Sequence, residues 1–235
     1  MGDYSYDEFK AHLKFQLGNR SDLSSHSVLG DLYGEWINQA YMTLTTKDSF
    51  FGKRIKLRFP ELMTNDSSQA TVDGTAYIST PTDALYIEGV WDSENDTILE
   101  GISWDQYKSY TGRADTDSEG EPKEWVRRGS LIYLYQTPDD AYDMVIYYRK
   151  RVDRLDGSSY DTTEIGEEWD EPILQLAVIQ SLQRLRMFDE ASKLKPEWLE
   201  TVMDLANIYS NEEFDREMQV TPHQGWMSDS KFYRR

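Results

Sequence analysis

The sequence predicts an α+β protein in which N- and C-terminal helices pack as a bundle, with an inserted antiparallel β domain and an extended C-terminal arm. Apolar residues recur at helical spacing in residues 1–48 and 168–218, whereas short alternating runs between turn residues fill 49–167. Because neither set of helices is large enough to close a core alone, we expect both to form one helical domain. Residues 219–235 show no period, and we expect them to be the arm.

The N-terminal segment predicts two helices. Ser5 and Glu8 have the spacing of a capping box, and the short apolar repeat that follows ends at Gly18. A wider apolar stripe predicts a second helix that ends near Thr46. We attribute its aromatic residues to helix packing rather than to a ligand site. The members of this stripe are Leu29, Leu32, Tyr33, Trp36, Ile37, Ala40, Tyr41 and Leu44.

The middle segment predicts several strands. Between Lys53 and Phe59, basic and apolar residues alternate until Pro60 ends the pattern. The polar residues 64–69 predict a turn, and the low-hydrophobicity stretch 111–124 predicts an exposed acidic loop. Further strands are expected at 70–78, 84–91 and 97–102, followed by one short helical turn at 103–110.

The strongest β pattern lies in residues 125–151, which predict a β-hairpin. Its strands are expected at 130–136 and 141–148, and Pro138 presets the backbone of the connecting turn. Both faces of the strands are apolar over most of their length, so we expect them to be covered on more than one side. Aromatic residues of this hairpin and of the helices would form the scaffold: Trp36, Trp125, Tyr133, Tyr135, Tyr147 and Trp169.

Two further helices are expected near the C-terminus. Residues 170–172 provide an acidic first turn and a proline at the first helical position, which starts a helix that runs to about Phe188. Its apolar residues surround most of the circumference, which indicates a buried helix. A last helix is expected to start at Pro196 and to run to about Met218.

Composition excludes several classes of protein. The chain has 43 acidic and 25 basic residues and a net charge of −18, which argues against broad binding to nucleic acid phosphates. The absence of cysteine excludes disulfides, thiolate nucleophiles and cysteine zinc sites. No apolar run reaches membrane-spanning length, so we expect a soluble protein without membrane contact.

We find no pattern for catalysis, and we expect no cofactor. His12, His26 and His223 are scattered, and the sequence has no glycine-rich phosphate loop or nucleophile elbow. Residues 115–121 begin like an EF-hand loop, but Pro122 and the missing final glutamate break the pattern. We interpret this stretch, and the smaller acidic cluster of Asp92, Glu94 and Asp96, as solvated turns rather than metal sites.

The C-terminal residues carry apolar side chains that have no evident core of their own. A segment of this kind is either disordered or buried on a partner. We hypothesise a partner-binding role, and the residues that would bind are Trp226, Met227, Lys231, Phe232, Tyr233, Arg234 and Arg235.

The order of elements and several loose motifs resemble one known family. The motifs are L-x3-W-I-N-Q-A-Y at 32–41, W-x3-G-x-L-I-Y-L-Y-x2-P-D at 125–139, Y-x4-Y-Y-R at 142–149 and E-W-D at 168–170. Together they cover roughly residues 6–218, and they resemble the head-to-tail adaptor (connector, neck) proteins of tailed bacteriophages.

The resemblance implies a structural virion protein without enzymatic activity, assembled in the host cytoplasm. Copies would form a ring, commonly a dodecamer, beneath the portal protein and join it to tail or neck components. DNA would pass through the ring without specific binding. The arm 219–235 would grip the portal, with Trp226, Phe232 and Tyr233 as anchors and with Lys231, Arg234 and Arg235 on acidic portal patches.

Two alternatives remain open at this point. Within structural proteins, the main alternative is another neck component, such as a stopper or tail-completion protein. From a different class, an acidic β domain with exposed tryptophan and tyrosine residues is compatible with a carbohydrate-binding protein or hydrolase, because aromatic rings stack on sugars. Saturable quenching of tryptophan fluorescence by glycans would distinguish that second alternative.

Overall fold

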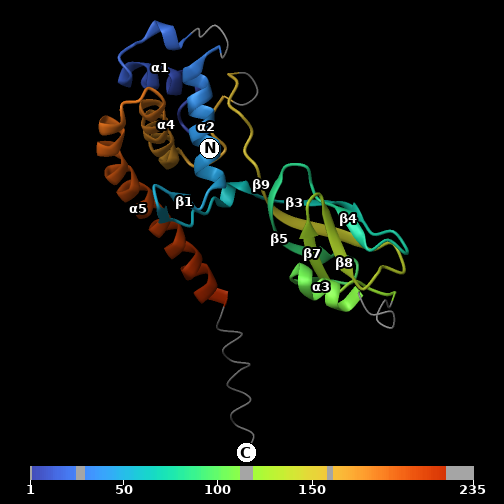
Figure 1. Cartoon of the computed structure of the whole chain (residues 1–235). Coiled ribbons are helices and arrows are strands. Elements are labelled where there is room, and N and C mark those ends of the chain that lie inside the picture. Colours follow the sequence, from blue (N-terminus) through green and yellow to red (C-terminus); the bar gives the residue numbers. More distant parts are fainter. Residues whose placement is uncertain (1, 25–29, 112–118, 158–160, 221–235) are drawn as a thin grey trace, which may run out of the picture. The chain divides into compact units, whose positions relative to one another are not determined.

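The computed structural model describes residues 2–24, 30–111, 119–157 and 161–220, and its side chains up to residue 208. The chain divides into two compact units (Figure 1). The helical unit consists of Met1–Phe59 and Asp153–Arg235, and the β unit consists of Pro60–Val152. The sequence pattern placed the ends of the β segment at 49 and 167, so both borders of the compact β unit lie further inside the chain.

The described part of the helical unit contains four α-helices and one short hairpin. Its helices are α1 (Tyr6–Gln16), α2 (Leu32–Thr46), α4 (Asp170–Arg184) and α5 (Phe188–Val220), with 3-10 turns at Ser21–Leu23 and Glu167–Trp169. The hairpin is formed by β1 (Ser49–Phe50) and β2 (Lys53–Arg54). None of the helices in the described ranges is long and apolar enough to cross a membrane.

Side-chain caps start the first two helices, and the cap of α1 is the one that the sequence predicts. The Ser5 hydroxyl accepts from the Glu8 amide at 3.3 Å, and the Glu8 carboxylate accepts from the Ser5 amide at 2.9 Å, which confirms the capping box. The Asp31 carboxylate accepts from the Tyr33 amide at 3.1 Å and caps α2. The predicted end of α2 at Thr46 is also confirmed.

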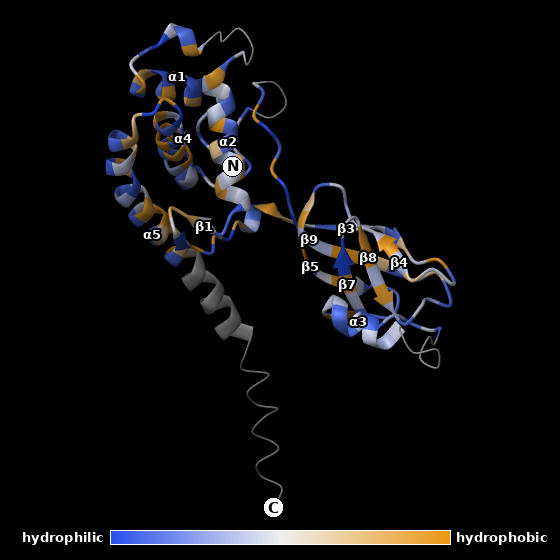
Figure 2. Ribbon diagram, viewed as in Figure 1, coloured by the Kyte–Doolittle hydropathy of each residue, from blue (hydrophilic) through white to orange (hydrophobic). Residues whose placement is uncertain are grey.

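Helix α4 is the centre of this unit. It packs against α1, α2 and α5, and Figure 2 shows hydrophobic positions recurring along it. Trp169, just before α4, is fully buried and meets the ring of Phe59 edge-on at a centroid distance of 5.0 Å. The Trp198 indole of α5 donates to the Pro172 carbonyl at 2.8 Å. These contacts confirm that α4 is buried.

Two predicted boundaries in the helical unit are wrong. Helix α4 ends at Arg184 rather than near Phe188, because Arg186 takes a left-handed conformation at φ 63° and reverses the chain. Helix α5 starts at Phe188, so Pro196 lies inside it. A proline inside a helix costs about 3 kcal/mol. Here α5 persists because it buries an apolar face, which includes Ala191, Trp198, Leu199 and Val202.

The predicted strand at 53–59 exists only in part. Ile55, Leu57 and Phe59 are buried and alternate with exposed basic residues, so the predicted alternation is confirmed. Only Lys53 and Arg54 pair with another strand, however. An alternating pattern of buried and exposed residues predicts an extended backbone with two faces, but it does not predict that another strand pairs with it.

The β unit is one curled seven-stranded sheet. Its strand order is β3-β9-β5-β6-β7-β8-β4; the pair β6–β7 is parallel and all its other pairs are antiparallel. Helix α3 (Trp104–Thr111) lies in the connection between β6 and β7. The strands are β3 (Met63–Ala70), β4 (Tyr77–Ser79), β5 (Ala84–Asp92), β6 (Thr97–Gly101), β7 (Glu124–Arg128), β8 (Leu131–Tyr135) and β9 (Asp143–Lys150).

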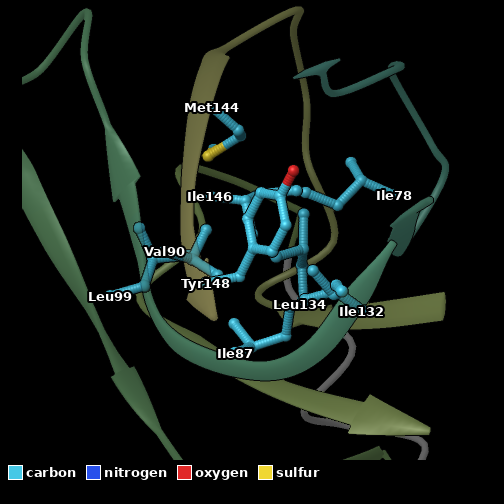
Figure 3. Close-up of a cluster of buried hydrophobic side chains, with 10 residues drawn as sticks. Ile78, Ile87, Val90, Leu99, Ile132, Leu134, Met144, Ile146 and Tyr148 are labelled. Carbon is cyan, nitrogen blue, oxygen red and sulfur yellow. The ribbon is translucent and has the colours of Figure 1, made fainter. Parts of the chain in front are cut away.

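The sheet encloses its own hydrophobic core. Figure 3 shows Ile87 and Val90 on the curved strand β5 pointing toward Leu134 and Tyr148 from β8 and β9. Side chains from β4 and β6 complete the cluster, so strands from the middle and one end of the sheet line one core. The members are Ile78, Ala84, Ile87, Val90, Leu99, Ile132, Leu134, Met144, Ile146 and Tyr148.

The predicted hairpin of 130–136 with 141–148 is wrong, although both strands exist. They are β8 and β9, but β8 pairs with β7 and β4, whereas β9 lies between β3 and β5. The actual hairpin joins β7 to β8 through Gly129, at φ 65°, with Arg128 opposite Leu131. An alternating apolar pattern identifies a strand and its buried face, but it does not identify the strand's neighbour.

The predicted turn at 64–69 is also wrong, because these residues form most of β3. No side chain of β3 is buried, and its backbone pairs with β9 on one side. An edge strand can therefore be polar over most of its length. The strand predicted at 70–78 is replaced by the end of β3, a connection at 71–76 and the short β4, whereas β5 and β6 confirm the two strands that were predicted next.

Two predicted segments lie largely outside the described residues. The acidic loop was expected at 111–124, of which 112–118 are not described, and Glu124 already belongs to β7. The arm was expected at 219–235, but Gln219 and Val220 belong to α5. Residues 221–235 lie outside the description.

Candidate interaction surfaces

The predicted partner-binding residues cannot be placed. Trp226, Met227, Lys231, Phe232, Tyr233, Arg234 and Arg235 all lie outside the described residues.

The six scaffold residues divide between core and surface. Trp36 and Trp169 are 3% and 0% exposed in the helical unit, and Trp125 packs against the β core. Tyr133 lies 5.2 Å from Trp104 of α3 and Tyr135 lies 4.8 Å from Tyr110, so both help to attach α3 to the sheet. Tyr147, in contrast, is 42% exposed on the outer side of the sheet.

Helix α2 fixes the segment by which the chain returns from the β unit. The buried Asn38 side chain accepts from the Leu155 amide at 2.8 Å and donates to the Leu155 carbonyl at 2.9 Å. One turn further along α2, the Tyr41 hydroxyl accepts from the Glu164 amide at 2.8 Å, and burial raises the pKa of Tyr41 well above its usual range. Both residues belong to the W-I-N-Q-A-Y motif, and both position backbone rather than bind a ligand.

Asp170 fixes the N-terminus in a similar way. One of its carboxylate oxygens accepts from the amides of Asp3 and Tyr4 at 2.7 and 2.8 Å, and the other accepts from the Thr163 hydroxyl at 2.9 Å. The side chain is 2% exposed, and burial raises its pKa despite these hydrogen bonds. This carboxylate is therefore structural.

The β1–β2 hairpin presents an exposed aromatic ring beside α5. Its two-residue turn consists of Phe51 at φ 48° and Gly52 at φ 84°. Glycine adopts this region freely, but a bulky aromatic residue there is an outlier that carries strain. Phe51 is 38% exposed; its ring lies 5.4 Å from that of Trp198, and the Lys195 ammonium lies 5.3 Å from its centroid.

A groove runs between this hairpin and α5. One part, of about 600 Å³, has Phe51, Pro196, Leu199 and Met203 as its apolar lining, with Glu200 and Asp204 on the α5 side. An adjoining part, of about 480 Å³, shares Lys53, Met203 and Asn207 with the first. We call the two parts together the α5 groove.

One end of the α5 groove is basic. Lys53, Arg54 and Lys56 line the smaller part together with Ile55, Met203, Ala206 and Asn207, and no carboxylate is among these residues. In a chain with a net charge of −18, these three exposed cations make a local region of opposite charge. Within the described residues, none of the three forms an ion pair with a carboxylate.

The outer face of the β sheet carries a second apolar surface. Tyr86 and Met63, which are 60% and 43% exposed, both lie opposite Arg149, and Ile98, at 80% exposed, lies opposite Trp91. Residues that are directly paired across antiparallel strands share a face. Together with Tyr147 they form one surface across β3, β9, β5 and β6, which we call the outer sheet face.

Among the described residues, neither surface contains a cluster of side chains that could hold a metal ion. In the described ranges, no three histidine, aspartate or glutamate side chains are placed to hold a metal ion. Asp92 of the acidic cluster is fully buried and caps its own turn, where it accepts from the Glu94 and Asn95 amides at 3.0 and 3.1 Å. The surfaces are suited instead to contacts with other proteins.

Comparison with known families decides which family of proteins the chain belongs to. The sequence model of the SU10 adaptor protein family matches residues 4–224, which include every helix and strand of both units. The chain belongs to the SU10 adaptor protein family. No curated protein matches the chain. The family resemblance seen in the sequence motifs is thereby confirmed, and the family is one of structural phage adaptors, which is not an enzyme class.

Membership in the SU10 adaptor protein family implies a place in the virion and association with portal and tail components. Sequence reasoning did not find the α5 groove. The sequence feature that points to the groove is the Phe51-Gly52 pair between two short extended runs. This pair favours a tight turn, but it does not show that the side chain of Phe51 stays exposed.

Proposed function

We propose that this chain is a head-to-tail adaptor whose copies form a ring, commonly a dodecamer, beneath the portal and join the portal to the tail around a DNA channel. The observation that carries the proposal is the family match over residues 4–224. The two exposed apolar surfaces support it, because contiguous apolar patches on a folded protein mark contacts with other proteins.

The charge of the chain is compatible with a channel. A ring of subunits, each with a net charge of −18, repels the DNA backbone, so DNA moves through it without being held. Specific recognition of DNA is not part of the proposal.

Two regions of the chain receive a role in this proposal. Residues 219–235 bind the portal, with Trp226, Phe232 and Tyr233 as apolar anchors and with Lys231, Arg234 and Arg235 on acidic portal patches. The outer sheet face contacts tail or neck components. Many weak identical contacts then add through closure of the ring.

Truncation tests the portal contact. A chain that ends at Met218 should keep its fold, measured by circular dichroism and thermal unfolding, but should be lost from assembled particles. A variant with Trp226, Phe232 and Tyr233 replaced by serine should behave in the same way. The matched control Ser228→Ala/Ser230→Ala, in the same segment, should be incorporated normally. Normal incorporation of the truncated chain would remove the portal-binding role of these residues.

Ring formation has a separate test. The purified chain alone should be monomeric or weakly associated in analytical ultracentrifugation, and it should form rings visible by electron microscopy when portal protein is added. A chain that remains monomeric with its portal would contradict the proposed ring.

A further inference from the structure

The first turn of α5 is an exposed apolar and acidic projection. Met187 and Phe188 are 38% and 58% exposed, and Asp189 and Glu190, which follow them, are also exposed. Neither carboxylate forms an ion pair with a described cation. We call residues 187–190 the α5 projection.

The α5 projection and the basic end of the α5 groove are complementary. The projection offers an aromatic ring and a methionine beside two carboxylates. The groove offers an apolar lining of Leu199, Met203 and Phe51 beside three cations, Lys53, Arg54 and Lys56. Apolar contact gives affinity, and opposite charges determine which surfaces meet.

The two surfaces cannot meet within one copy. The projection lies at the start of α5 and the groove lies along a later part of the same helix, and at 1.5 Å per residue Glu190 and Met203 are separated by about 20 Å along it. A contact between two different patches of identical chains is heterologous, and such a contact produces a closed ring when the rotation between subunits closes.

The strained turn supports a role for the groove. Phe51 adopts a left-handed conformation that costs a non-glycine residue about 1–2 kcal/mol, and its ring nevertheless stays partly exposed at the rim. Strain of this kind concentrates at functional positions. The backbone conformation alone would favour asparagine or glycine at this turn position.

We propose that the α5 projection of one adaptor copy inserts into the α5 groove of its neighbour and that this contact closes the ring. The inference rests on the proposed ring and names its interface. A second copy is the occupant that we propose, because the chain itself carries an exposed apolar and acidic projection whose charge is opposite to that of Lys53, Arg54 and Lys56.

Charge reversal of each surface tests the contact. The groove variant Lys53→Glu/Arg54→Glu/Lys56→Glu and the projection variant Asp189→Lys/Glu190→Lys should each remain folded and each fail to form rings with portal protein. An equimolar mixture should recover rings, because the negative groove accepts the positive projection and the positive groove accepts the negative projection. Such rings contain the two variants in alternation, and they can form only if each contact joins the groove of one copy to the projection of the next.

A matched control separates a local contact from total charge. Lys14→Glu/Lys108→Glu/Lys123→Glu changes the net charge as much as the groove variant does, at exposed positions that are not among the residues lining the groove. This control should form rings normally. Rings formed by the groove variant alone, or no recovery in the mixture, would overturn the inference while the ring itself stands. A wild-type chain that forms no rings with portal would instead contradict the proposed function.

The apolar part of the contact has its own test. Phe188→Ser should raise the protein concentration required for ring formation at least tenfold. Phe15→Ser, at a more exposed phenylalanine of α1, should leave that concentration unchanged. Equal behaviour of the two variants would show that Phe188 is not buried by a neighbour.

Discussion

The Asn38 side chain bonds to both backbone groups of Leu155, with its oxygen 2.8 Å from the Leu155 amide and its nitrogen 2.9 Å from the Leu155 carbonyl. The amide nitrogen also donates to the Gly34 carbonyl at 3.1 Å. A single side chain thus provides both hydrogen-bond partners that the buried backbone of Leu155 requires.

Replacing Asn38 by alanine should destabilise the protein by about 2–4 kcal/mol, because it leaves two buried backbone groups of Leu155 without partners. Urea unfolding followed by tryptophan fluorescence measures this change. Gln39→Ala, at the next and exposed position of α2, should change the free energy of unfolding by less than about 0.5 kcal/mol. Equal effects of the two substitutions would show that the Leu155 contact is unimportant.

Asp170 predicts a pH dependence of stability. Burial raises its pKa above the ordinary value of 3.8, so folding favours the protonated form. Its favourable contribution is therefore complete below pH 3.8 and is lost as the pH rises through the raised pKa. Asp170→Asn does not ionise, and its amide can still accept from Tyr4 and donate to the Thr163 hydroxyl.

Relative to the Asp170→Asn variant, the wild-type protein should therefore lose stability as the pH rises from 3.8, and the difference should level off above the raised pKa. Thermal unfolding of both proteins from pH 3.5 to 7.5 tests this. A difference that is constant across that range, or that changes in the opposite direction, contradicts the raised pKa.

Phe51→Asn separates folding from assembly. Asparagine tolerates a left-handed conformation, so relief of strain offsets the loss of ring contact with Trp198, and the free energy of unfolding should change by less than about 1 kcal/mol. Portal-induced ring formation should weaken, because the groove loses its aromatic rim. A loss of several kcal/mol in stability would mean that Phe51 serves the fold alone.

The outer sheet face should act after the ring has formed. Tyr86→Ser/Ile98→Ser removes two exposed apolar side chains, so unfolding should change little. Rings should form normally with portal, but the yield of particles with attached tails should fall. Thr82→Ser/Ser93→Ala, which leaves the face itself unchanged, is the control. Normal tail attachment by the double variant would show that this face is not the tail contact.

Local features of the fold were predictable from the sequence, and strand partners were not. The capping box of α1 and the end of α2 depend on neighbouring residues, and both are where the sequence places them. The partner of β8 depends on residues far away in the chain, so the predicted hairpin joined the wrong strands. Strand β3 was missed because an edge strand without buried side chains has no apolar pattern.

The surfaces were harder to predict than the core. Burial leaves a periodic record in the sequence, as in α4 or β9, whereas exposure of Phe51 or Phe188 does not. The turn at Phe51–Gly52 and the helix containing Pro196 both break local preferences. At Phe51 the departure coincides with the α5 groove, and it can be recognised only when the fold is known.

The strands by which the β unit begins and ends are neighbours: Met63 of β3 lies directly opposite Arg149 of β9. Since the inserted polypeptide starts and finishes at adjacent points, and its hydrophobic cluster comes entirely from within it, a different module with similarly spaced ends can be exchanged for it without opening the helical core. Under the proposed function, such an exchange would give one ring-building framework a new set of tail specificities.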